Sequence, residues 1–155
     1  MSRTKPPSTG QDRRGEDRVA LPKVTVLGLG QMGLVCAGLL TTNEQGGDKR
    51  FEGSPATKGV RVSMWGHNPE EVGRVAQTRR SIRLEGFVLS DEVKVELSDA
   101  DALHDATMIV SAIPVQHTRE TWERLAPHVP PGAGVVSVAK GIEIATLLRP
   151  TQIIT

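Results

Sequence analysis

The stretch Lys23-Val-Thr-Val-Leu-Gly-Leu-Gly-Gln-Met-Gly33 decides the fold of this chain. A short apolar run rich in β-branched residues comes first. Gly28-x-Gly30-x-x-Gly33 follows, and then a helix-like stretch from Leu34 to Leu40. This order predicts a strand, a glycine turn and a helix. Such a unit presents backbone N–H groups and a helix N-terminus to the pyrophosphate of a dinucleotide.

Each of the three glycines has its own predicted role in that turn. Gly28 permits the tight turn, Gly30 lets phosphates approach the backbone, and Gly33 lets the helix pack closely on the strand. We expect each role to fail if a Cβ is added. The stretch therefore predicts a dinucleotide-binding site that includes Gly28, Gly30 and Gly33.

The rest of the chain alternates between strand-like and helix-like segments. This alternation predicts an α/β fold with a doubly wound, Rossmann-type, mostly parallel sheet. We expect residues 22–155 to form one dinucleotide-binding domain, incomplete at its C-terminal end. The expected strands are 24–27, 60–65, 93–97, 108–113 and 134–138, and the expected helices are 31–40, 117–125, one begun by Asn68-Pro69 and one begun by Ser98. Composition predicts that strand 108–113 is fully buried.

Two segments lack the pattern of a folded core. Residues 1–21 are expected to form a disordered polar tail, because they are rich in Pro, Ser, Arg and Gly near the N-terminus. Thr41 to Gly59 shows no core-forming period and reads as a surface insertion. The apolar stretch from Val24 to Leu40 falls short of the ~20 residues of a membrane span, so a buried strand and helix explain it better.

Composition limits the partners that we expect. The 155 residues carry a net charge of +1 with interleaved signs, which does not favour nucleic acid or an anionic membrane. Cys36 is the sole cysteine, so the chain has no intramolecular disulfide, and a cytoplasmic location is expected. We expect Cys36 and the two tryptophans, Trp65 and Trp122, to be core residues. The spacing of His and Asp residues does not predict a metal site.

The tip of the second expected strand bears on the choice of cofactor. An acidic residue at this point holds the ribose 2′-OH of NAD. Here Gly66, His67 and Asn68 follow the strand, without a carboxylate. A 2′-phosphate is therefore permitted, with His67 or Asn68 as donor, and NADPH is slightly favoured over NADH. His67 as a plain polar turn residue is the alternative.

Lys140 follows the last expected strand and precedes Gly141. Ligands of open α/β sheets bind outside the carboxyl ends of the strands. A lysine at that edge can reach a phosphate or a carbonyl oxygen, and Gly141 would let the backbone turn close to the ligand. The alternative is that Lys140 is simply solvated.

Several segments together resemble the NAD(P)-dependent glycerol-3-phosphate dehydrogenases. They are Gly28-Leu-Gly-Gln-Met-Gly33, Met64-Trp-Gly-His67, Ala112-Ile-Pro-Val-Gln116 and Val138-Ala-Lys-Gly-Ile-Glu143. Arg83-Leu-Glu-Gly86 is similar to a family loop that ends in Leu-Pro-Gly, with Glu85 in place of the proline. Within residues 138–143, the sequence Lys-Gly-Ile-Glu is the part that best distinguishes this family from other dehydrogenases.

The resemblance implies roles for particular residues. Gln31, Met32 and His67 match positions that contact the cofactor, and His117 matches a position that lines it. Lys140 matches a position that contacts both cofactor and substrate. The family reduces dihydroxyacetone phosphate to sn-glycerol 3-phosphate, a precursor of phospholipids, and a homodimer is expected for the full-length enzyme.

The 155 residues do not contain the family's second, all-helical domain, which supplies the general acid/base lysine. We therefore expect this chain to bind the cofactor but to turn over poorly or not at all. Two alternatives stay open. One is the cofactor domain of a 3-hydroxyacid dehydrogenase, which shares the first glycine loop. The other is a nucleotide-binding module without catalysis.

Overall fold

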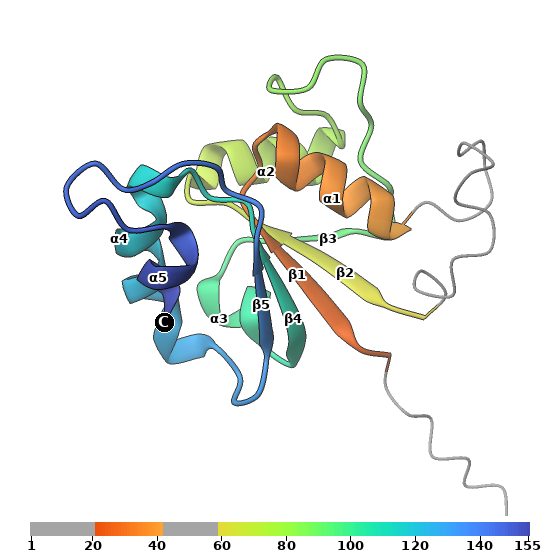
Figure 1. The fold of residues 1–155 in the computed structure, drawn as a ribbon. Helices are drawn as coiled ribbons and strands as arrows, with labels where there is room; N and C mark the ends of the chain where they lie inside the picture. Colours follow the sequence, from red (N-terminus) through yellow and green to blue (C-terminus); the bar gives the residue numbers. More distant parts are fainter. Residues whose placement is uncertain (1–20, 42–58) are drawn as a thin grey trace, which may run out of the picture.

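Five parallel strands form one sheet with helices on both faces (Figure 1). The computed structural model describes residues 21–41 and 59–155. In chain order the elements are β1 (Lys23–Leu27), α1 (Gln31–Thr41), β2 (Arg61–Trp65), α2 (Pro69–Thr78), β3 (Lys94–Glu96), α3 (Asp99–Leu103), β4 (Ala106–Ser111), α4 (Val115–Leu125), the short 3₁₀ turn η2 (Ala126–His128), β5 (Gly134–Ser137) and α5 (Pro150–Ile154).

The strand order is β3-β2-β1-β4-β5. β1 lies in the middle, with its Val26 beside Met64 of β2 and Val110 of β4. The chain moves outward from β1 to β3 and then returns to the other side of β1 with β4. This reversal makes the gap between β1 and β4 a topological switch point, where open α/β sheets bind ligands at the carboxyl ends of their strands. The predicted doubly wound, parallel fold is confirmed.

Alternate residues of each strand supply two separate cores. On one face α1 and α2 cover the sheet, and on the other α3 and α4 do so, with α5 packed on α4. The first core includes Val24, Val26, Leu34, Ala37, Val62, Met64, Val72 and Val75. The second includes Leu27, Trp65, Leu103, Ile109, Trp122 and Leu125. Both tryptophans are core residues, as predicted.

Among the described residues, the buried polar side chains on the second face are hydrogen-bonded. Thr25 Oγ1 donates to the carbonyl of Ala102 at 2.7 Å and lies 3.0 Å from Ser63 Oγ. The indole N–H of Trp122 donates to Ser111 Oγ at 3.1 Å. Because unpaired buried polar atoms are costly, these hydrogen bonds fix how α3 and α4 lie on the sheet.

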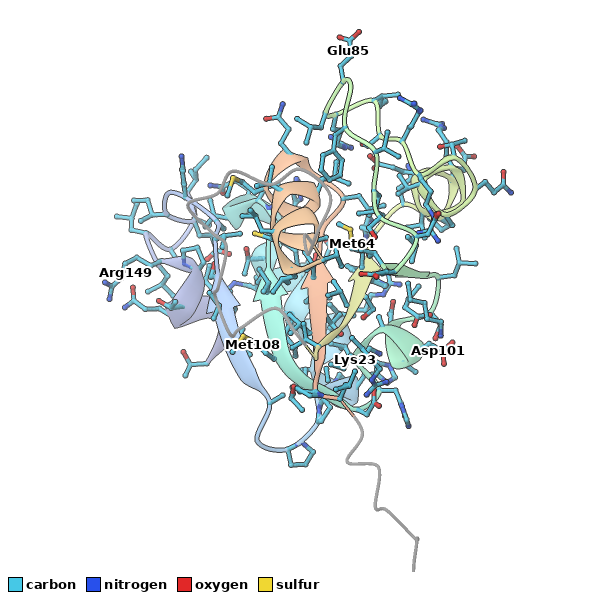
Figure 2. The ribbon with its side chains drawn as sticks, turned by 90° about the vertical axis from the view of Figure 1, so that its right-hand side faces the viewer. Lys23, Met64, Glu85, Asp101, Met108 and Arg149 are labelled. Atoms are coloured by element: carbon cyan, nitrogen blue, oxygen red, sulfur yellow. The ribbon has the colours of Figure 1, made fainter. Side chains whose placement is uncertain are left out.

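Lys23 ties the amino edge of the sheet to α3. Its ammonium donates to the carbonyls of Asp101 and His104 at 2.9 and 3.0 Å, where the helix ends. Figure 2 shows Lys23 and Asp101 close together at this edge. Burial lowers the pKa of Lys23, and the nearby carboxylate of Asp105 opposes that shift. The contact is a helix cap at the edge opposite the predicted site.

Local capping signals are confirmed. The side-chain oxygen of Asn68 accepts from the backbone N–H groups of Glu70 and Glu71, so α2 begins at Pro69 as predicted. Ser98 Oγ accepts from Asp101 N and opens α3. These hydrogen bonds satisfy N–H groups that a helix leaves without internal partners.

Other expectations need correction. β4 runs from Ala106 to Ser111, and it is not fully buried: Thr107 and Met108 are exposed, Met108 by 43%. Met108 lies on the same face as Val110, which is only 9% exposed, but closer to the start of the strand. Cys36 is half-buried beside the first core, and burial raises its thiol pKa. α5 was not predicted. Most of the tail and of the 41–59 insertion lies outside the described residues.

The second core gives a direct test of the fold. Leu125→Ala, which truncates a fully buried side chain of α4, should lower the free energy of unfolding by about 2–5 kcal/mol because it leaves a cavity. Leu97→Ala is the matched control, because that leucine is 67% exposed, and it should cost less than about 0.5 kcal/mol. Urea denaturation measures both. Equal losses would contradict the assigned core.

Candidate dinucleotide site

The turn between β1 and α1 is held by close backbone contacts. Gly28 has a φ of +116°, which residues with a Cβ rarely adopt. A Cβ on Gly28 would also lie 2.8 Å from the carbonyl oxygen of Ala112. The N–H of Gly28 donates to Trp65 O at 2.7 Å, which extends the pairing of β1 with β2 into the turn.

The other two glycines differ sharply in their surroundings. A Cβ on Gly33 would lie 2.0 Å from the carbonyl oxygen of Gly28, so helix α1 lies against the turn without room for a side chain. A Cβ on Gly30 would meet no atom within 4 Å. Packing in the protein therefore requires glycine at position 33 but not at position 30. The open space beside Gly30 is where the sequence predicts that phosphates approach.

Helix α1 points its N-terminus at this open space. Its first backbone hydrogen bond runs from Leu34 N to Gly30 O at 3.0 Å. The N–H groups of Gln31, Met32 and Gly33 precede it and have no partner within the helix. Both Gln31 and Met32 are exposed. An anion beside Gly30 would meet several N–H donors and the positive end of the helix dipole.

The carboxyl ends of β4 and β5 lie beside this turn. Ala112 N donates to Leu27 O at 2.8 Å, and Val138 N donates to Ser111 O at 3.0 Å. These two hydrogen bonds prolong the sheet past the ends of its strands. They bring the loop after β4 and the loop that carries Lys140 to the same edge as the glycine turn.

The tip of β2 contributes Gly66, His67 and Asn68. A Cβ on Gly66 would come within 2.9 Å of side-chain atoms of Leu29 and Val72, so this glycine makes room for the buried leucine of the glycine loop. His67 is exposed. The side-chain oxygen of Asn68 is engaged in capping α2, which leaves its NH₂ group as a donor.

His117 and Lys140 come from the loops on the other side. His117 lies in the first turn of α4 and is exposed, and Lys140 is exposed at the end of β5. Gly141 has a φ of +94°, so the backbone turns sharply after Lys140 as predicted. Within residues 21–41 and 59–155, Lys140 takes part in no ion pair, so its charge is available.

Two arginines, one in β2 and one in α2, lie in different places. Arg61 donates to Leu21 O and Asp105 Oδ2 at the amino edge, far from the glycine turn. Arg74 is exposed on α2. The structure thus gathers Gly28, Gly30, Gln31, Met32, Gly33, His67, His117 and Lys140 at the carboxyl edge of the sheet. Their roles toward a ligand stay predictions.

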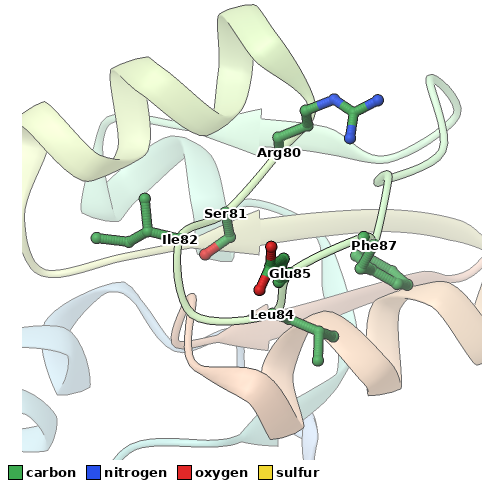
Figure 3. Close-up of a pocket in the computed structure, with 7 residues that line it drawn as sticks. Arg80, Ser81, Ile82, Leu84, Glu85 and Phe87 are labelled. Atoms are coloured by element: carbon green, nitrogen blue, oxygen red, sulfur yellow. The ribbon is translucent and has the colours of Figure 1, made fainter.

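A pocket lies elsewhere, in the loop between α2 and β3 (Figure 3). Its lining includes Arg80, Ser81, Ile82, Leu84, Glu85 and Phe87. The ring of Phe87 packs on α1 at Gly38, two turns beyond the glycine turn. Glu85, which stands where the family loop has proline, is exposed at the tip of this loop (Figure 2). The pocket therefore belongs to the loop and not to the dinucleotide site.

Sequence reasoning missed the contacts among four side chains near Lys140: Gln116, Arg119, Glu143 and Thr146. Arg119 of α4 donates twice to the carboxylate of Glu143, at 3.0 and 2.8 Å. Hydrogen bonds from Arg119 and Thr146 hold the pKa of Glu143 below its usual range. The side chain of Gln116 also forms hydrogen bonds with the backbone of the loop that carries Lys140, at Ile142 and Ile144. No local signal reveals the ion pair, because its two residues are 24 positions apart.

Two further features are absent from residues 21–41 and 59–155. Among the described residues no helix has the length and apolar character to cross a bilayer. The same residues hold no cluster of three or more His, Cys, Asp or Glu side chains suited to a metal ion.

Comparison with known proteins places the chain in a family. A model described as "NAD-dependent glycerol-3-phosphate dehydrogenase N-terminus" matches residues 23–155. A glycerol-3-phosphate dehydrogenase [NAD(P)+] of Lactobacillus delbrueckii is 34% identical over 134 residues, covering 86% of this chain and 35% of the relative. One from Prosthecochloris aestuarii is 36% identical over 132 residues, covering 84% and 35%. The chain thus spans about a third of these relatives' length.

Solved structures show the same fold. Glycerol-3-phosphate dehydrogenase from Coxiella burnetii matches with a TM-score of 0.68 at 18% identity, covering 86% of this chain and 37% of that one. The enzyme from Saccharomyces cerevisiae matches with a TM-score of 0.64 at 23% identity, covering 87% and 38%. At these identities the likeness establishes the fold alone.

The different surroundings of the glycines predict different costs. Gly33→Ala should lower the free energy of unfolding by about 3 kcal/mol or more, because the new methyl group meets the Gly28 carbonyl. Gly30→Ala should change it by less than about 1 kcal/mol, because its methyl group points into open space. Urea denaturation separates the two. A large loss for Gly30→Ala would show that packing fills the space.

Proposed function

The chain belongs to the NAD-dependent glycerol-3-phosphate dehydrogenase family, as its N-terminal part, and on this premise we propose that it binds NAD(P) at the carboxyl edge of β1, β2 and β4. The observation that supports this most directly is the open space beside Gly30, at the N-terminus of α1. The pyrophosphate fits this space because it is anionic and the helix offers free N–H donors.

The remaining site residues surround that position. The exposed Gln31 and Met32 flank the pyrophosphate from the first turn of α1, and His67 meets the adenosine ribose from the tip of β2. His117, in the first turn of α4, lines the cofactor from the other side of β1. The strand order supports this assignment, because doubly wound sheets bind the two halves of a dinucleotide on either side of the switch point.

We further propose that the complete enzyme reduces dihydroxyacetone phosphate to sn-glycerol 3-phosphate. The bound nicotinamide supplies a hydride for the C2 carbonyl carbon. Lys140 would contact cofactor and substrate, and its ammonium would stabilise the negative charge that develops on the carbonyl oxygen. The general acid/base lysine of the family's helical domain would supply the proton that completes the alcohol. The family match favours this activity over that of a 3-hydroxyacid dehydrogenase and over a module without catalysis.

NADPH is the cofactor that the tip of β2 favours. Gly66, His67 and Asn68 place no carboxylate where one would repel a 2′-phosphate. Glu71, in the first turn of α2, is paired with Arg83, whose Nε donates to it at 2.6 Å. Donors on His67 and Asn68 remain for the phosphate.

Location and assembly are also proposals. The sole cysteine and the soluble-type dehydrogenase fold fit a reducing cytoplasm, and the full-length enzyme is proposed to be a homodimer. Its small-molecule partners are dihydroxyacetone phosphate and sn-glycerol 3-phosphate, and the phosphoester product is proposed to serve phospholipid synthesis.

Gly30→Asp tests cofactor binding. The carboxylate would enter the space meant for the pyrophosphate, so the NADPH affinity measured by calorimetry should fall at least about a hundredfold. Stability should not fall, because aspartate is a favourable first residue for a helix. Gly73→Asp on α2 is the control, because a Cβ there also meets open space. Unchanged NADPH affinity in Gly30→Asp would refute the proposed cofactor site.

His67→Asp tests the cofactor preference. A carboxylate here would accept from the 2′-OH of NADH and repel the 2′-phosphate of NADPH. The ratio of NADPH to NADH affinity should fall at least about tenfold. His128→Asp, an exposed change in η2, should leave the ratio as it is. An unchanged ratio in His67→Asp would show that His67 is only a polar turn residue.

A further inference from the structure

The loop that carries Lys140 is held on helix α4 by four side chains, which we call the α4 clamp: Gln116, Arg119, Glu143 and Thr146. The loop runs from residue 138 to residue 149 without a regular helix or strand. Such a segment does not hold its own shape, because it lacks a repeating pattern of backbone hydrogen bonds. Its position depends on what grips it.

The centre of the clamp is a two-point ion pair. Arg119 Nε and Nη2 donate to the two carboxylate oxygens of Glu143, at 3.0 and 2.8 Å, and Thr146 Oγ1 donates to one of them. The Glu143 side chain is only 9% exposed, whereas that of Arg119 is 42% exposed. A planar guanidinium that meets a carboxylate at two points fixes orientation as well as distance.

Gln116 grips the backbone on both sides of Glu143. Its Nε2 donates to Ile142 O at 2.9 Å, and its Oε1 accepts from Ile144 N at 3.1 Å. Gln116 and Arg119 are three residues apart on α4 and therefore lie on one face of the helix. Helix α4 thus holds three consecutive residues of the loop.

These contacts bracket Lys140. On one side Val138 N donates to Ser111 O and ends the sheet two residues before it. On the other side the clamp takes hold at Ile142, two residues after it. Between these points Gly141 turns with a φ of +94°. The backbone at Lys140 is therefore anchored from both directions, while its exposed ammonium has no ion-pair partner in the described part of the chain.

We propose that Gln116 and Arg119 are positioning residues, which hold the Lys140 loop so that the ammonium meets the bound cofactor and substrate. This inference rests on the proposed function, because the position of Lys140 matters only if the edge binds a ligand. Neither residue needs to touch the ligand. The clamp would raise the affinity for the ligand by preorganisation, because a loop that is already ordered loses less conformational entropy on binding.

Local order is tested first, without any ligand, by amide hydrogen exchange. Arg119→Met and Gln116→Ala should each speed exchange at Glu143 and Ile144 at least about tenfold, because these two loop amides are hydrogen-bonded and the loop then opens more often. Exchange in β5 should stay the same. The Gln116 variant leaves no buried charge unpaired, so it serves if Arg119→Met fails to fold. Unchanged exchange in the loop of Gln116→Ala would overturn the clamp.

The link to Lys140 is tested by calorimetry with NADPH. Lys140→Ala should weaken binding roughly tenfold, and Arg119→Met several-fold. In the Lys140→Ala background, Arg119→Met should cause no further loss, because the clamp acts through the lysine. Losses that multiply in the double variant would overturn the positioning role. Failure of the unchanged chain to bind NADPH would refute the proposed function and this role together, but would leave the exchange result standing.

Arg124→Met is the matched control. Arg124 lies on the same helix and also donates twice to a carboxylate, that of Asp99, at 2.5 and 2.6 Å. Its partner belongs to α3, however, and not to the Lys140 loop. The control should change neither the exchange of the loop amides nor the NADPH affinity. A loss of affinity equal to that of Arg119→Met would show a general effect of α4 and overturn the proposal.

Discussion

The close contact between Gly28 and Gly33 is the constraint on which the rest of the site depends. A Cβ at Gly33 would lie 2.0 Å from the Gly28 carbonyl oxygen, so helix α1 can begin directly against the end of β1 only without side chains there. This contact aims the N-terminus of α1 at the gap between β1 and β4. The Ala112 carbonyl closes the other side of the turn and excludes a Cβ on Gly28. The three glycines therefore have two different roles. Gly28 and Gly33 allow close packing within the protein, and Gly30 leaves open space for a ligand.

The charges around this edge favour an anionic ligand. The helix N-terminus contributes free N–H groups, and Lys140 contributes a positive charge that is not engaged in an ion pair within the described residues. Two nearby carboxylates are neutralised: Glu71 by Arg83 and Glu143 by Arg119. Helix N–H donors and a lysine without an ion-pair partner in the described residues favour the binding of phosphates at this edge. The ion pair of Glu143 also anchors the loop from which Lys140 projects.

Much of the fold could be predicted, because its signals are local. Runs of β-branched residues predict the strands. Asn68 and Ser98 predict the starts of two helices, because each accepts hydrogen bonds from N–H groups at most three residues further along the chain. Errors arose where burial depends on distant elements. Met108 is an apolar residue within a β-branched run, yet it is 43% exposed in the folded chain. The α5 helix packs on α4, and the sequence pattern near residue 150 does not predict this contact.

The sequence by itself determined the glycine turn, the alternation of strands and helices, and the family to which the chain belongs. These are carried by residues that are neighbours along the chain, or by motifs that follow one another in order along it. Only the tertiary structure decided that packing requires Gly33 and not Gly30, that Gly66 makes room for Leu29, and that Arg119 reaches Glu143 across 24 positions. Each of these is a distance between atoms of different segments. Such distances exist only once the strands have paired and the helices have packed.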